Sequence, residues 1–112
     1  MKRIENNIDY LKVLSKCKKN LRNGIIMNSD KEQIYTLCEC ILNLLHGNIN
    51  ISEDQFNQLK PYKHTFRKIL NNKEKLKSKK KLIVQKGGFL EILLPAVISG
   101  LSAIISSAIS SS

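Results

Sequence analysis

Apolar residues recur at steps of three and four along the first seventy positions, which is the spacing of one face of an α-helix. The first such series is Ile4, Ile8, Leu11, Leu14, Cys17 and Leu21, and the helix stop signal Asn23-Gly24 follows it. The second series is Ile34, Leu37, Cys38, Ile41, Leu44 and Leu45, and Gly47 follows it. We therefore predict amphipathic helices over residues 4–22 and 30–46.

Capping boxes predict where two helices begin. Ser29 and Ser52 are each followed, three positions later, by a Glu or Gln that can return a hydrogen bond to the cap. The second box predicts a third helix from Glu53, and Pro61 predicts a break, after which the apolar series resumes. We expect an all-α fold, with three or four short helices packed as an N-terminal bundle over residues 4–70.

The C-terminal quarter of the chain is apolar and follows a lysine-rich stretch. Residues 73–86 predict a helix from Ser78 onward, and Gly87-Gly88 interrupts it. Segment 89–109 has the length of about twenty residues that crosses a bilayer, although Glu91 and Pro95 lie within it. Insertion into a membrane would use its large apolar residues, which are Phe89, Leu90, Ile92, Leu93, Leu94, Val97, Ile98, Leu101, Ile104 and Ile105.

Two other interpretations of this tail stay open. Small residues at steps of four would let two such helices approach closely, which favours self-association. The tail could also be a C-terminal helix buried against the bundle. On either hypothesis the chain divides into a helical domain at 1–72, a lysine-rich basic segment at 73–86, and a diglycine hinge with its apolar tail at 87–112.

Charge is distributed unevenly along the chain. The formal net charge is +10, from nineteen Lys and Arg against nine Asp and Glu. Residues 73–86 contain a single acidic residue, Glu74, beside seven lysines, which are Lys73, Lys75, Lys77, Lys79, Lys80, Lys81 and Lys86. Such a block favours an anionic partner, which could be nucleic acid, an anionic membrane or an acidic protein, over a merely solvated linker. Without interleaved aromatics, we expect phosphate contacts and no base stacking.

Cysteine content and motifs exclude several classes of site. Three cysteines without a secretory signal at residues 1–15 indicate reduced thiols. Cys38 and Cys40 would project about 200° apart on a helix, so no metal site is expected, and no cofactor motif is present. The chain contains no phosphate-binding glycine loop and no hydrolase signature, so we do not expect an enzyme.

The run Lys86-Gly87-Gly88-Phe89-Leu90-Glu91-Ile92-Leu93-Leu94-Pro95, continuing to Gly100, resembles the C-terminal part of the adenovirus core protein X (mu) precursor. The whole chain resembles the small basic proteins of Polinton (Maverick) elements and adintoviruses. This resemblance implies a virion core protein that binds packaged DNA, in the virion and in the host nucleus or cytoplasm. It also implies cleavage by a viral cysteine protease between Gly88 and Phe89, after the pair Gly87-Gly88.

Three functions follow as hypotheses. The first is non-specific DNA binding through the lysines. The second is a membrane-active or membrane-anchored protein that inserts its apolar helix. The third is a helical adaptor that oligomerises through the tail.

Overall fold

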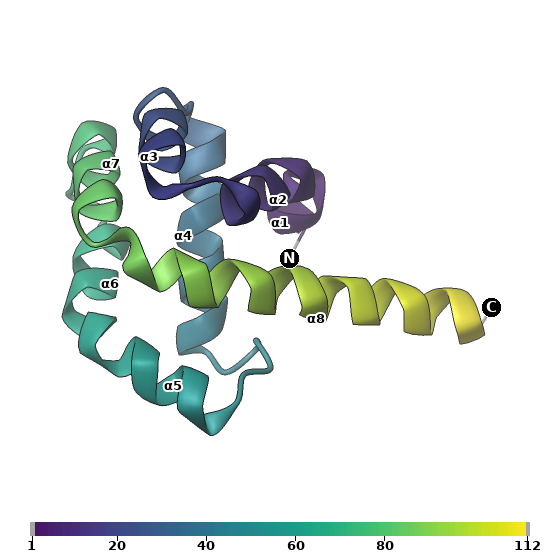
Figure 1. The fold of residues 1–112 in the computed structure, drawn as a ribbon. Coiled ribbons are helices and arrows are strands. Elements are labelled where there is room, and N and C mark those ends of the chain that lie inside the picture. Colours follow the sequence, from purple (N-terminus) through teal and green to yellow (C-terminus); the bar gives the residue numbers. More distant parts are fainter. Residues whose placement is uncertain (1, 112) are drawn as a thin grey trace.

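Helix α4 (Lys31–Leu45) lies at the centre of the molecule, and α1, α6, α7 and α8 all pack against it (Figure 1). The computed structural model describes the backbone of residues 2–111 and the side chains of residues 2–100. Over this range the protein is all-α, as predicted, and no strand occurs. The other elements are α1 (Lys2–Asn6), α2 (Ile8–Lys16), α3 (Lys19–Met27), α5 (Glu53–Leu59), the 3-10 turn η1 (Lys60–Tyr62), α6 (Lys63–Leu70), α7 (Leu76–Gln85), the 3-10 turn η2 (Gly87–Phe89) and α8 (Leu90–Ser111).

The single helix predicted over residues 4–22 is wrong, because the chain breaks at Asn7 and again at Cys17 and Lys18. Both Cys17 and Lys18 have extended backbones, and α3 then runs through the expected stop at Asn23-Gly24 to Met27. The break changes which face of the chain is buried. Leu21, expected in the core, is 61 % exposed, whereas Arg22 is 4 % exposed.

Helix α4 begins and ends close to the predicted residues, but its N-cap is Asp30 and not the predicted Ser29. The box is formed by Asp30 and Gln33: the Gln33 backbone N–H donates to Asp30 Oδ1 at 2.8 Å, and the Asp30 N–H donates to Gln33 Oε1 at 3.0 Å. Ser29 instead hydrogen-bonds to the Tyr10 hydroxyl at 2.7 Å, which links the α4 start to α2. After α4, Gly47 adopts a φ of 74°, the left-handed conformation that ends helices.

The second capping box is confirmed by its hydrogen bonds. The Gln55 N–H donates to Ser52 Oγ at 3.1 Å, and the Ser52 N–H donates to Gln55 Oε1 at 2.8 Å, so α5 begins at Glu53. The break predicted at Pro61 is η1, between α5 and α6. Helix α7 begins at Leu76, two residues before the predicted Ser78.

The described part of the apolar tail belongs to the hydrophobic core. Phe89, Leu90, Leu93, Leu94 and Val97 are at most 4 % exposed and pack with buried residues of α2, α4 and α6. Ile83 of α7 lies in the same core. The segments 1–72, 73–86 and 87–112 are therefore not kept apart, because they share one apolar interior.

The diglycine is a packed corner between two helices. Gly87 is buried, and a Cβ added at Gly88 would lie 2.8 Å from the Tyr62 hydroxyl. The rings of Phe66 and Phe89 meet edge to face at 4.9 Å, and Tyr62 contacts Phe89 at 5.6 Å. The chain bends by 72° at this corner. Close aromatic packing therefore replaces the flexible hinge expected from the sequence.

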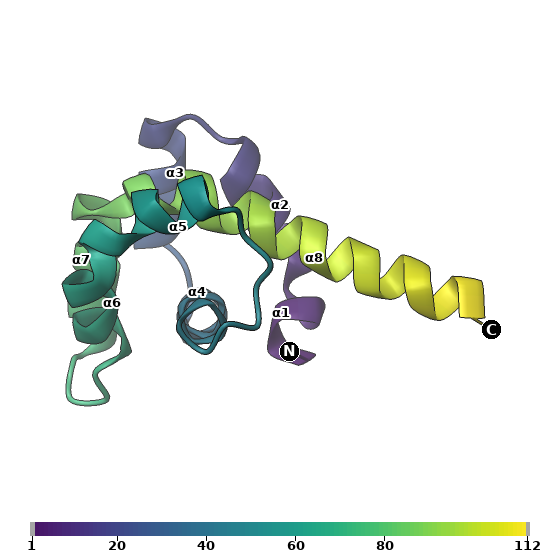
Figure 2. The same cartoon turned by 90° about the horizontal axis from the view of Figure 1, so that it is seen from below.

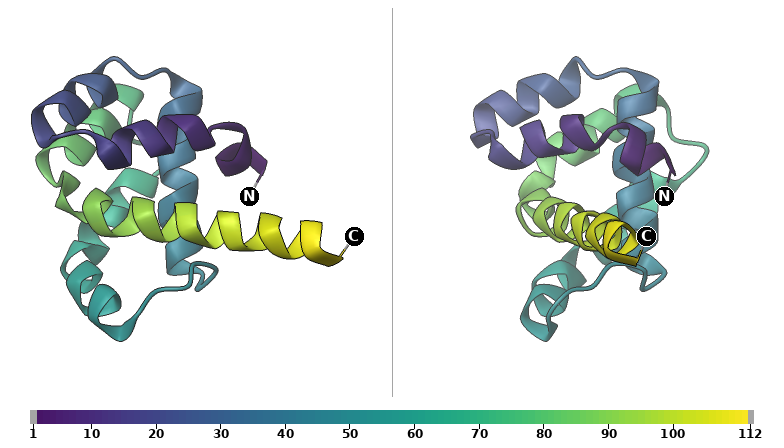
Figure 3. Two further views of the ribbon diagram at one scale, coloured as in Figure 1. Left: turned by 45° about the vertical axis from the view of Figure 1, so that its right-hand side comes forward. Right: turned by 90° about the vertical axis from the view of Figure 1, so that its right-hand side faces the viewer.

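Helix α8 crosses the molecule beside α2 and α4, and its C-terminal turns extend beyond the other helices (Figure 3). Three residues of the membrane-insertion hypothesis, Leu101, Ile104 and Ile105, lie outside the residues whose side chains are described. Of the others, Ile92 and Ile98 are half-buried.

Candidate nucleic-acid interface

Helix α7 packs between α3 and α6, so two segments that are far apart in the sequence become neighbours (Figures 1 and 2). Lys80 Nζ of α7 donates a hydrogen bond of 3.2 Å to the Met27 carbonyl at the end of α3. At the other end of this contact, the Arg22 guanidinium of α3 lies beside Gly87. Because α7 runs antiparallel to α3, the start of α3 lies toward the Lys86 end of α7.

These neighbouring elements contain most of the positive charge. Segments 18–27 and 60–88 hold fourteen of the nineteen Lys and Arg residues but only Glu74 among the nine acidic residues. The rest of the chain has a small excess of negative charge. We name as the basic face the eleven exposed cations of these segments, which are Lys18, Lys19, Lys60, Lys63, Arg67, Lys68, Lys73, Lys75, Lys77, Lys81 and Lys86.

None of the eleven forms an ion pair within the described part of the chain, where the ion pairs involve Arg3 and Arg22. Their ammonium and guanidinium groups are therefore available to an external anion. A surface with many cations that have no partner carboxylate produces a positive potential that attracts polyanions.

The seven predicted lysines divide into three groups. Lys73, Lys75, Lys77, Lys81 and Lys86 are exposed, as a phosphate-binding role requires. Lys80 is half-buried and is hydrogen-bonded to the end of α3. Lys79 is 5 % exposed, so its assignment to the binding surface is wrong.

Lys79 stabilises the end of another helix. Its Nζ donates to the carbonyl of Ile69 and, at 2.9 Å, to the carbonyl of Asn71, both at the C-terminus of α6. The last carbonyls of a helix have no partners within it and form the negative end of its dipole. A lysine projecting inward from α7 therefore joins α6 to α7.

Sequence inspection missed the six exposed cations outside residues 73–86. Residues 60–72 contain four cations and no acid, which was a visible signal. Lys18 and Lys19, at the start of α3, gave no such signal, because only the packing of α3 on α7 brings their segment beside the lysine-rich one.

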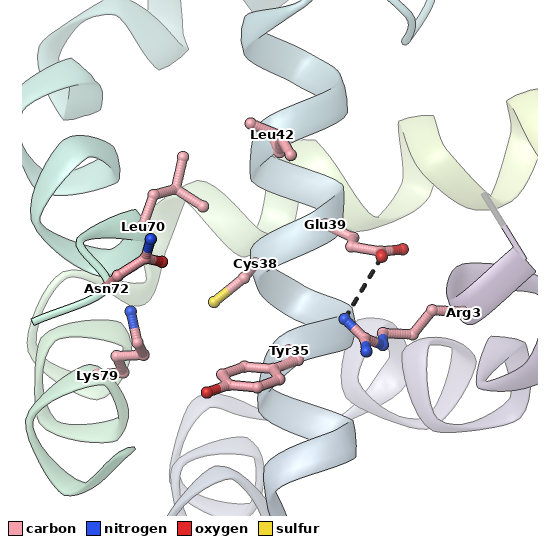
Figure 4. Close-up of a pocket in the computed structure, with 8 residues that line it drawn as sticks. All are labelled: Arg3, Tyr35, Cys38, Glu39, Leu42, Leu70, Asn72 and Lys79. Atoms are coloured by element: carbon pink, nitrogen blue, oxygen red, sulfur yellow. Dashed lines mark hydrogen bonds and ion pairs between the residues drawn. The ribbon is translucent and has the colours of Figure 1, made fainter. Parts of the chain in front are cut away.

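A cavity of about 580 Å³ opens beside Lys79 and is lined by Arg3, Tyr35, Cys38 and Glu39, among others (Figure 4). Arg3 is already paired with Glu39 at 3.4 Å and with Glu32 at 3.1 Å. Burial raises the pKa of Cys38, despite the opposing effect of Lys79. This thiol therefore stays protonated at neutral pH and is a poor nucleophile.

Cys40 is fully buried, and burial raises the pKa of its thiol to about 12, with a smaller contribution from Glu39. All three cysteines are free thiols. Within the described residues no group of three His, Cys, Asp or Glu side chains is placed to hold a metal ion.

Arg22 connects α3 to the diglycine corner and to α8. Its side chain is 5 % exposed, and Nη1 lies 3.6 Å from Glu91 Oε1, while Nε has no hydrogen-bond partner. Glu91 is 69 % exposed and lies in the first turn of α8, where the positive end of the helix dipole stabilises a negative charge. This contact holds α8 against α3.

Two of the three predicted processing residues, Gly87 and Phe89, are buried, whereas Gly88 is exposed. Gly87, Gly88 and Phe89 form the 3-10 turn η2, and the Phe89 side chain is 0 % exposed. In the described residues no single helix meets the length and apolarity needed to cross a membrane. The bent pair Leu76–Gln85 and Gly87–Gly100 meets these criteria only when its members are taken together.

Compared with protein-family models, curated proteins and solved structures, the chain matches none of them. The resemblance of residues 86–100 to the adenovirus core protein X precursor, and of the whole chain to Polinton and adintovirus proteins, stays a prediction.

Proposed function

We propose that this protein binds nucleic acid without sequence specificity, through contacts between its basic face and phosphates. One observation carries the proposal: segments 18–27 and 60–88, whose helices α3, α6 and α7 pack together, hold fourteen of the nineteen cations and one of the nine acids. Lysines act as mobile point charges and read no base, so most of the affinity comes from released counterions. The packaged DNA of an adenovirus-like element would be such a partner, as the resemblance implies.

A salt titration on duplex DNA tests this proposal. If about six of the eleven exposed cations contact phosphate, the plot of log K against log salt has a slope of about −5. Fluorescence anisotropy with a labelled duplex measures this slope. An affinity that does not change between low and moderate salt would overturn the proposal.

Two matched variants locate the interface. Lys77→Gln/Lys81→Gln removes two exposed cations one turn apart on α7, and Lys12→Gln/Lys16→Gln removes two with the same spacing on α2. The α7 pair belongs to the basic face and the α2 pair does not. We expect the α7 variant to make the slope less steep by about 2 and the α2 variant to change it by less than half as much. Equal effects would mean that binding depends on net charge alone.

Membrane insertion has a structural cost that DNA binding lacks. Five of the seven described side chains assigned to insertion are buried in the core, so inserting them would open the fold. Phosphate binding uses side chains that are already exposed. We therefore place nucleic-acid binding first.

A further inference from the structure

An apolar cleft of about 480 Å³ lies where the end of α4 meets α5 and α6. Its floor is formed by Leu59 and Phe66, which are at most 3 % exposed. Its sides are formed by Leu45 and Phe56, which remain 43 % and 51 % exposed. Among the described residues Phe56 is the most solvent-exposed aromatic side chain.

The rim of this cleft belongs to the basic face. Lys60 and Lys63 line it, and the Lys60 ammonium lies 5.4 Å from the centroid of the Phe56 ring. No carboxylate lines the cleft. Glu53 and Asp54 lie in the first turn of α5, about one turn away from Phe56. An apolar opening with a cationic rim is suited to a flat apolar group that is joined to a negative charge.

We propose that this cleft accepts a base of single-stranded nucleic acid, which stacks on Phe56 while Lys60 and Lys63 contact the flanking phosphates. This inference rests on the proposed function, since it assigns a particular class of nucleic acid to the same surface. In a duplex the bases are paired and stacked on one another, so only an unpaired strand can present a base to Phe56. The exposed ring thus adds a preference for single strands to non-specific phosphate binding.

Stacking on this ring requires the Lys60 ammonium to move. The Lys60 ammonium now lies over the Phe56 ring, and the base would take its place. Lys60 is exposed and its stem is flexible, so the ammonium can move to a phosphate without any change in the backbone. Bases of every kind have a π face, so the preference is for unpaired strands and not for a sequence.

A substitution pair tests the role of the ring. Phe56→Ala removes it, and Leu42→Ala is the control, because Leu42 is 41 % exposed, lies on α4 and lines the other cavity. We expect Phe56→Ala to weaken binding of a twelve-nucleotide oligothymidylate about tenfold and to leave duplex binding within twofold. Leu42→Ala should change neither. An abasic strand with the same number of phosphates should bind the Phe56→Ala variant and the parent chain equally.

Tryptophan fluorescence gives a second test of the base site that does not depend on measuring binding affinity. The chain contains no tryptophan, so Phe56→Trp and Leu42→Trp each introduce a single tryptophan, which can be excited selectively over the three tyrosines. The oligothymidylate should quench the tryptophan at position 56 and leave that at position 42 unchanged, and inorganic polyphosphate should quench neither.

Each failure has a distinct meaning. If Phe56→Ala binds the single strand as well as the parent does, while Lys77→Gln/Lys81→Gln binds more weakly, the base site is overturned and the proposed function stands. If the parent chain binds neither strand form, both proposals fall. If an acidic amphipathic peptide binds in a way that depends on Phe56 and single strands do not, the cleft is a protein-docking site and the inference is overturned.

Discussion

Two lysines two residues apart on α7 show how differently the same side chain is used. Lys81 is exposed on the basic face, whereas Lys79 points inward and donates to the carbonyls of Ile69 and Asn71 at the end of α6. Two positions along a helix is a rotation of about 200°, so the side chains project from nearly opposite faces. A lysine run on a helix therefore cannot act as one uniform charged surface.

Replacing each of these lysines by methionine should separate the two uses. Lys79→Met leaves the last α6 carbonyls without their buried donor and should lower the free energy of unfolding by about 2 kcal/mol. Lys81→Met should leave stability within about 0.5 kcal/mol and weaken duplex binding. Urea denaturation followed by circular dichroism measures the first effect and anisotropy the second. Equal stability of the two variants would contradict the capping role of Lys79.

At the scale of elements, α8 is the helix whose role differs most from the prediction. It was expected to be separated from the bundle by a hinge, yet its first turns supply Phe89, Leu90, Leu93, Leu94 and Val97 to the core. The corner that leads into it is held by the Tyr62 and Phe66 rings and by Arg22. The helix that resembles a membrane segment in sequence is a core helix in its described half.

Truncations that end before and after the core residues of segment 89–97 should differ in stability. A chain ending at Gly88 loses the five buried side chains, each worth roughly 2 kcal/mol on burial. Their sum, about 10 kcal/mol, is as large as the whole stability of a small domain. We expect that chain to be unfolded by circular dichroism and a chain ending at Gly100 to remain folded. A folded, cooperative 1–88 chain would contradict the packing of α8.

At the scale of the whole molecule, opposite charges are segregated on different elements. Segments 18–27 and 60–88, which include α3, α6 and α7, hold fourteen of the nineteen cations, while the rest of the chain holds eight of the nine acids. Such a molecule would be oriented by the field of a polyanion before contact, with its basic face toward the phosphates. The long-range packing of α3 on α7 creates this polarity, because the two segments are separated by some fifty residues of chain.

The whole fold also controls access to the Gly88–Phe89 bond. Proteases bind extended chain, and this bond lies in a 3-10 turn whose buried Phe89 ring packs against Tyr62 and Phe66. If the cleavage that the resemblance implies occurs, an adenovirus-type cysteine protease should cut a peptide spanning residues 82–94 much faster than the folded chain. Mass spectrometry of both substrates measures this, and low urea should speed cleavage of the folded chain. Equal rates would contradict burial of the bond, and an intact peptide would disprove the cleavage hypothesis.

Local interactions allowed the sequence by itself to determine the class of fold and several helix boundaries. The Ser52 box and the Gly47 stop involve groups within a few residues of each other, so they form wherever the rest of the chain lies. The apolar repeat of residues 30–46 likewise required α4 to be a helix with one buried face. These features were predicted because their causes lie within one or two helical turns.

Only the tertiary structure decided which faces are buried, which cations are free and where the tail lies. Burial depends on partners that are distant in sequence. Arg22 forms an ion pair with Glu91, Lys80 donates a hydrogen bond to the Met27 carbonyl, and the ring of Tyr62 packs against that of Phe89. Phe56 lies only four residues before Lys60, so their proximity is local, and the packing decided only that the ring stays exposed at a cleft. Apolar periodicity shows that a segment has a face to bury, and packing alone determines whether a bilayer, a second chain or the rest of the same chain covers it.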